Sequence, residues 1–120
     1  MALSNAALNI AADAIAAAAT HARLHTGDPG GSGTSNVASS AVETITWGSA
    51  SGSGDVSISG PVQFTGGTPS GAATHITLWD GDPGSGGTFL GSQALTGDQT
   101  FNSAGEYTLT DLSLDGTATA

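Results

Sequence analysis

Residues 19–34 read ATHARLHTGDPGGSGT and residues 73–88 read ATHITLWDGDPGSGGT, a repeat in which ten of sixteen positions are identical without a gap. In the second copy apolar and polar residues alternate from Ile76 to Leu78, which is typical of a half-buried β-strand. We therefore predict a strand over residues 20–26 in the first copy as well. The shared Asp-Pro-Gly predicts a turn after each strand, because Pro fixes φ and Gly accepts a positive φ.

A helix is predicted over residues 4–19, before the first copy of the repeat. Ser4 is a suitable N-cap, and alanine, the strongest helix former, dominates the segment. Helical spacing places a single apolar stripe on this helix, which we expect to pack against a sheet. The stripe consists of Leu8, Ala11, Ala12, Ile15 and Ala19.

Alternation with a period of two predicts further strands in the rest of the chain, at residues 43–47, 56–58, 62–64, 76–78, 107–109 and 112–114. The phase is kept across Gly60-Pro61, which predicts one long strand kinked at that point. The phase slips between Leu109 and Leu112, which predicts a bulge or a change of sheet near Asp111.

Glycine-rich segments separate these strands at short intervals. This pattern predicts a mainly β fold, an antiparallel β-sandwich of jelly-roll-like type with about seven or eight strands and one N-terminal α-helix. We expect a single domain over residues 1–120, with the helix at 4–19 and the sandwich at 20–120.

Small residues fill most of the chain. Ala, Gly, Thr and Ser together occupy 70 of 120 positions, whereas the larger apolar residues number 25. Burial of so few large side chains offsets little of the ordering entropy of an isolated chain. We therefore expect help from neighbours, in a homo-oligomer such as a trimer or on a larger particle.

The charge balance excludes several classes of partner. The net charge is −9, Arg23 is the only strong cation, and both lysine and cysteine are absent. Nucleic-acid binding and polybasic membrane attachment need several cations, so we expect neither. Residues 6–19 lack a preceding positive charge and contain Asn9 and Asp13, so we expect neither a signal peptide nor membrane insertion.

Two groups of residues could bind metal. Asp80 and Asp82 lie two positions apart in a loop, a spacing that suits calcium, although an ordinary turn uses the same residues. His21, His25 and His75 would approach one another if the repeated strands pair, which makes zinc the alternative to half-exposed strand histidines.

No motif for catalysis is present in the sequence. The chain lacks G-x-S-x-G, G-x-G-x-x-G and H-E-x-x-H, and the lack of lysine excludes S-x-x-K. We therefore expect a protein that is not an enzyme and needs no cofactor.

The two tryptophans have different expected roles. Trp47 is in phase with Ile45 and should face the core. Trp79 is out of phase with Ile76 and Leu78, so it should be exposed, packed under the helix, buried in a subunit interface or stacked on a sugar. The residues that we predict at interfaces are Trp79, Leu8, Ile15, Arg23 and Tyr107.

Several motifs together resemble a family of small virion proteins of tailed phages, especially actinobacteriophages, which are labelled tail fibre or minor structural proteins. The matching features are the alanine-rich helix leading into L-H-T-G-D-P-G at 24–30, Thr46 with Trp47, and Phe101 followed by G-E-Y-T-L-T at 105–110. The resemblance covers nearly the whole chain. It implies a fold and a location in the virion, and it implies no active site.

Three functions follow as hypotheses. The first is a virion structural protein that decorates the capsid in many copies, with the major capsid protein or tail proteins as partners. The second is a tail-associated or fibre-type module that binds a host glycan through Trp79 or the glycine-rich loops. The third is a secreted β-sandwich adhesin, with calcium held by the Asp80 and Asp82 loop.

Overall fold

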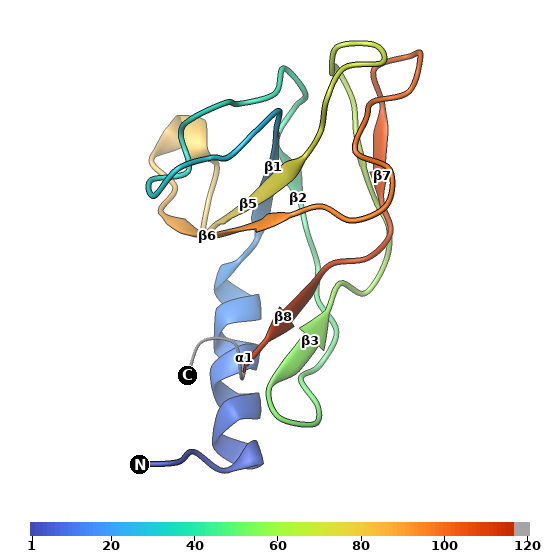
Figure 1. The fold of residues 1–120 in the computed structure, drawn as a ribbon. Coiled ribbons are helices and arrows are strands. Elements are labelled where there is room, and N and C mark those ends of the chain that lie inside the picture. The colour runs from blue at the N-terminus through green and yellow to red at the C-terminus, as the bar shows by residue number, and fades with distance from the viewer. Residues whose placement is uncertain (117–120) are drawn as a thin grey trace.

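The structure, a computed structural model, describes residues 1–116, with one helix projecting from a β-rich body (Figure 1). The helix is α1 (Asn5–Ala18), and a short 3-10 turn, η1, covers Pro83–Ser85. The strands are β1 (His21–His25), β2 (Glu43–Thr44), β3 (Asp55–Ser57), β4 (Val62–Phe64), β5 (His75–Trp79), β6 (Phe89–Ala94), β7 (Tyr107–Leu109) and β8 (Ser113–Asp115). The described part of the chain is thus mainly β and antiparallel with one N-terminal helix, as predicted.

Helix α1 begins and ends within one residue of the predicted limits. The Ser4 hydroxyl accepts a hydrogen bond from the Ala7 amide at 3.2 Å, which confirms it as the N-cap. Ala12 and Ala16 pack against Val56 of β3. In the described residues, no helix has the length and hydrophobicity to cross a membrane.

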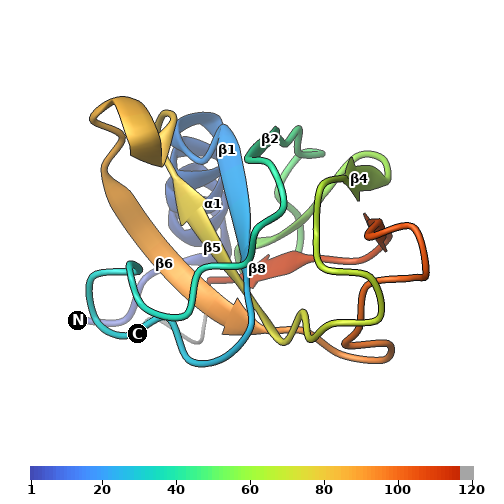
Figure 2. The same ribbon diagram turned by 90° about the horizontal axis from the view of Figure 1, so that it is seen from above.

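The repeated strands pair with each other. β1 and β5 lie antiparallel at the centre of a four-stranded sheet of order β2-β1-β5-β6. Their register places His21 opposite Trp79 and His25 opposite His75. In the view from above, β1 and β5 lie over the end of α1, with β6 beside them (Figure 2). The repeat therefore builds the middle of the main sheet from two equivalent halves.

The prediction of one long strand through Gly60-Pro61 is wrong. The two halves are separate strands in separate sheets, since β3 pairs with β8 and β4 pairs with β7. Pro61 has no amide hydrogen to continue a ladder, so the pairing breaks there. The predicted change of sheet near Asp111 is confirmed, because that residue lies between β7 and β8.

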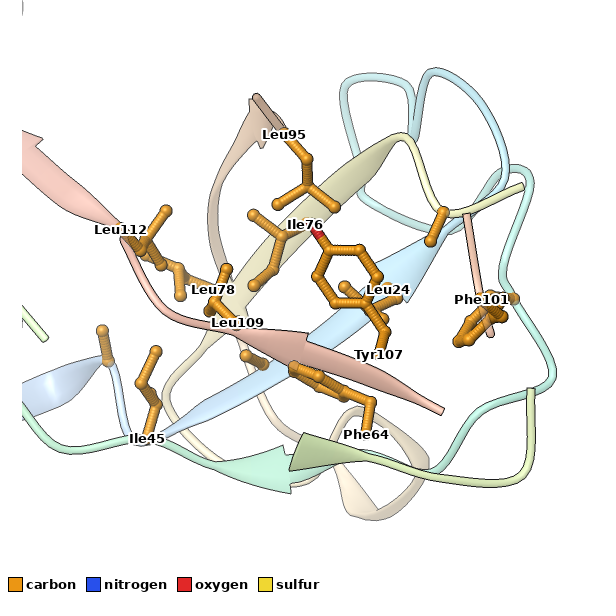
Figure 3. Close-up of a cluster of buried hydrophobic side chains, with 14 residues drawn as sticks. Leu24, Ile45, Phe64, Ile76, Leu78, Leu95, Phe101, Tyr107, Leu109 and Leu112 are labelled. Atoms are coloured by element: carbon orange, nitrogen blue, oxygen red, sulfur yellow. The ribbon is translucent and has the colours of Figure 1, made fainter. Parts of the chain in front are cut away.

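The main core lies between the four-stranded sheet and the β4–β7 pair (Figure 3). The side chains of Leu24 and Ile76 from the sheet point toward Phe64 and Leu109. Trp47 is half-buried, packs against both this core and the smaller one beneath α1, and donates from Nε1 to the Ala19 carbonyl at 2.9 Å. The prediction that Trp47 faces the core is confirmed.

Candidate functional site

A buried polar network lies on the other face of the main sheet. His25 is fully buried, and its Nδ1 lies 2.8 Å from the Ser35 carbonyl oxygen while its Nε2 lies 2.9 Å from Thr77 Oγ1. Because a carbonyl oxygen can only accept, Nδ1 carries the proton and Nε2 accepts from the Thr77 hydroxyl. Trp79 Nε1 donates to the same hydroxyl at 2.7 Å. The network ties the loop at Ser35 onto strands β1 and β5.

Burial dominates the electrostatics of this network. It lowers the pKa of His25, the Ser35 carbonyl opposes that shift, and the charges of Arg23 and His75 add to the lowering. The neutral ring already makes one hydrogen bond at each nitrogen, so His25 serves the fold and has no free nitrogen for a metal ion.

Trp79 and Arg23 lie against each other beside this network. The guanidinium carbon of Arg23 lies 5.0 Å from the centroid of the Trp79 ring, and the Phe89 ring lies 5.4 Å from it on a tilted plane. Trp79 is only 5% exposed, so its rings are not available to stack on a sugar in this conformation. Of the placements that the sequence left open for Trp79, exposure to solvent is excluded, because the ring is buried within this chain.

Arg23 is also committed within the chain. One of its guanidinium nitrogens donates to the Gly33 carbonyl at 3.1 Å, while its Nε is buried without a partner. Burial lowers the pKa of Arg23, and the nearby charge of Asp82 opposes that change. The interaction with Trp79 makes Arg23 part of the packing over the sheet.

The acidic loop residues close turns. Asp80 accepts from the Thr88 amide at 2.6 Å, and Asp82 accepts from the Gly84 amide at 2.8 Å. In the first copy of the repeat, Asp28 accepts from the Gly30 amide at 2.9 Å. Within residues 1–116, no three His, Asp or Glu side chains are grouped so that they could hold a metal ion. The ordinary turn explains these carboxylates.

The other two histidines make contacts with neighbouring threonines. His21 Nδ1 lies 2.8 Å from Thr20 Oγ1, and His75 Nδ1 lies 2.9 Å from Thr74 Oγ1. The register of the repeated strands places His25 directly opposite His75 but His21 opposite Trp79, and each ring makes its own hydrogen bond, so the three histidines are not gathered into a zinc site in the described residues.

Tyr107 belongs to the core. Its ring packs edge-on against Phe101 with centroids 6.4 Å apart, and its hydroxyl donates to the Asp98 carbonyl at 2.9 Å. Burial raises the pKa of Tyr107, and the charge of Asp98 adds to the rise. The side chain that the sequence predicts at an interface is thus placed inside this chain.

An apolar surface remains open around α1. Six large hydrophobic side chains are exposed in the described residues; four belong to α1 or the residues just before it, and Leu90 of β6 lines a groove together with two of these, Leu3 and Ile15. We call these five the α1 surface. They are Met1, Leu3 (57% exposed), Ile10 (71%), Ile15 (45%) and Leu90 (40%).

A groove of about 590 Å³ continues this surface between α1, the main sheet and β8. Leu8 and Ile15 of α1, with Leu3 just before it, line one side of the groove. Leu78, Leu90 and Leu114 are among the residues on the opposite side. Two of the predicted interface side chains, Leu8 and Ile15, are brought together in this groove.

The side of α1 that faces the body carries the polar residues Asn9 and Asp13 next to the buried Ala12 and Ala16, which the apolar stripe did not predict. Asn9 accepts from the Gly54 amide at 2.9 Å, and Asp13 accepts from the Ala50 amide at 2.8 Å. These bonds rotate α1 so that Ile10 and Ile15 stay open to solvent. The signal was present in the sequence, since Asn9 and Asp13 are one turn apart on a helix that is otherwise almost all apolar.

A family model described as "Podophage GP4 fiber I protein gp80" matches residues 1–117. The chain belongs to this family. No curated protein and no solved structure matches it. Membership makes the chain a structural component of a phage virion, as the resemblance implied, and the printed family name is that of a fibre protein.

The α1 surface is the best candidate for a functional contact in this chain. The polar candidates, Arg23, His25, Asp80 and Tyr107, all hydrogen-bond to other parts of the chain itself. The α1 surface is instead apolar and open. A structural protein acts by contact with neighbours, and this is the surface that offers such contact.

Proposed function

We propose that the chain is a non-enzymatic unit of a podophage tail fibre and that it contacts neighbouring virion proteins through the α1 surface. The family model that matches residues 1–117 carries the name of a fibre protein, which supports a fibre component. The observation behind the contact is the exposure of Ile10 and Ile15 on α1 and of Leu3 just before it. Apolar patches of this kind mark interaction sites in soluble proteins.

The small hydrophobic core beneath α1 also favours a place in an assembly. The core beneath α1 holds only three buried residues, Ala12, Ala16 and Val56, and two of these are alanines. Burial of an alanine stabilises far less than burial of a leucine, because the hydrophobic gain scales with apolar area. A neighbour that covers Ile10 and Ile15 would add the area that this end of the molecule lacks.

Localisation of the protein in the particle tests this proposal. Intact virions labelled with an antibody against this chain, with a gold-conjugated second antibody, would be viewed by electron microscopy. We expect label on fibres at the tail. Label over the whole capsid surface would overturn the proposal and favour capsid decoration, and an absence of the chain from purified virions would overturn both.

A further inference from the structure

The α1 surface carries almost no charge, although the chain as a whole is strongly acidic. Residues 1–20 contain one acidic residue, Asp13, and no basic residue, and the other nine acidic residues begin at Asp28. The Asp13 carboxylate is held against the loop by the Ala50 amide. Of the remaining carboxylates in the described residues, only Asp115 lines the groove. A second copy of this acidic chain would meet least repulsion at this surface.

The spacing of residues along α1 suits a second helix. Ala7, Ala11, Ala14 and Ala18 follow one another at intervals of four, three and four, which places them on one helical face. Ile10 and Ile15, both exposed, flank this face on its two sides. Small residues in the middle allow two helix axes to approach to about 8 Å, while the isoleucines supply apolar area at the edges.

We propose that the α1 surface is a contact between two copies of this chain, in which the two α1 helices pack antiparallel. The proposal rests on the contact role proposed above for this surface and names its occupant, but it does not depend on the fibre assignment. An antiparallel pair sets the positive N-terminal end of each helix dipole beside the negative C-terminal end of the other. Figure 1 shows α1 at one end of the molecule, with the N-terminus at its tip. The two acidic bodies then lie at opposite ends of the pair.

The area available predicts a weak association in solution. Helix α1 has 14 residues. At 1.5 Å per residue and a contact strip about 10 Å wide, one helix face covers about 200 Å², against about 800 Å² per partner in a stable interface. The second copy must therefore also cover Leu90 and the groove. We expect a dissociation constant in the micromolar range or weaker.

Sedimentation of the full chain over a micromolar to millimolar concentration series tests this contact. We expect the mass to rise toward two copies, and Ile10→Glu to abolish the rise without loss of the far-ultraviolet circular dichroism. Val37→Glu is the matched control, because Val37 is a similarly exposed apolar residue outside the α1 surface, and it should associate as the unmodified chain does. A chain that stays monomeric throughout, or an Ile10→Glu variant that still associates, would overturn the proposal.

Cross-linking tests the orientation, since the chain contains no cysteine of its own. Under mild oxidation, Ala11→Cys should form a disulfide with its copy, because residue 11 lies near the middle of the helix and meets itself. Leu3→Cys should not link to itself but should link to Ala18→Cys in a mixture. Efficient self-linking of Leu3→Cys, or a limiting mass of three copies, would overturn the antiparallel arrangement.

Discussion

His25 of β1 and Thr77 of β5 share a hydrogen bond of 2.9 Å, and both residues are buried on the face of the main sheet that points away from the main core. The bond joins the two copies of the repeat, but the two residues are not equivalent positions in it. Thr77 corresponds to Arg23, and His25 corresponds to Trp79. The repeat has thus diverged at the positions where its two copies meet.

Thr77→Val should destabilise the fold markedly. The valine keeps the shape of the side chain but removes the donor to His25 Nε2 and the acceptor for Trp79 Nε1. Two buried polar groups then lack partners, at a cost of about 1–3 kcal/mol each. Urea denaturation would measure the loss. Thr108→Val, on an exposed position of β7, is the control and should change the free energy of unfolding by less than about 0.5 kcal/mol.

The stability should fall in mildly acidic solution because of His25. Its pKa in the fold is lowered from the ordinary value of 6.5, so the unfolded chain binds more protons between the two values. The contribution is therefore fully present above about pH 7.5 and is lost as the pH falls through 6.5 toward the folded pKa. The measurement is the free energy of unfolding at intervals from pH 8 to pH 5.

A pair of histidine variants separates this effect from other titrations. His25→Gln lowers stability at every pH but should flatten the slope around pH 6.5. His21→Gln, at a half-exposed position in the same strand, should leave the slope unchanged. An equal slope in the unmodified chain and in His25→Gln would show that His25 is not its source.

Gly33→Ala should be poorly tolerated. Gly33 has a φ of +71° and a Cβ at this position would overlap the Phe89 ring, which packs on Trp79. We expect a loss of about 1–3 kcal/mol, from backbone strain and from displacement of the ring. Gly31→Ala is the matched control, since a Cβ there meets no atom within 4 Å. Thermal melts of the two variants should differ by several degrees.

Trp47→Phe should loosen the join between α1 and the body. The change removes the hydrogen bond from the indole to the Ala19 carbonyl and leaves a smaller ring between the two hydrophobic clusters. We expect a loss of about 1–2 kcal/mol in the free energy of unfolding. The Val37→Ala variant, at an exposed site, provides the reference. Comparable losses in the two variants would contradict the bridging role of Trp47.

Local signals in the sequence were sufficient for the helix and for most strands. Ser4 marks the start of α1 because capping depends on neighbouring residues alone, and the repeat identifies β1 and β5. Strand β6 was not predicted, since Gly91, Ser92 and Gln93 carry no alternating apolar pattern and become a strand by pairing with β5.

The candidate site depended on long-range contacts that a local pattern does not contain. Helical spacing placed Leu8 and Ile15 on the inner stripe, but the rotation of α1 is set by bonds from Asn9 and Asp13 to amides at Gly54 and Ala50, far along the chain. The burial of Trp79 likewise depends on a loop that folds over the sheet. Tertiary structure therefore decided which apolar side chains stayed open.

Trp47 lies between two hydrophobic clusters of different size, and the two parts of the molecule that they hold should therefore open locally at different rates. The cluster beneath α1 buries few atoms, so the helix can open and close while the sheet around Leu24 and Ile76 stays intact. Amide hydrogens of α1 should then exchange with solvent early and those of β1 and β5 late. A neighbour bound at α1 would slow the exchange of the α1 amides alone. Assembly would therefore be detected as slower hydrogen exchange at this end of the chain.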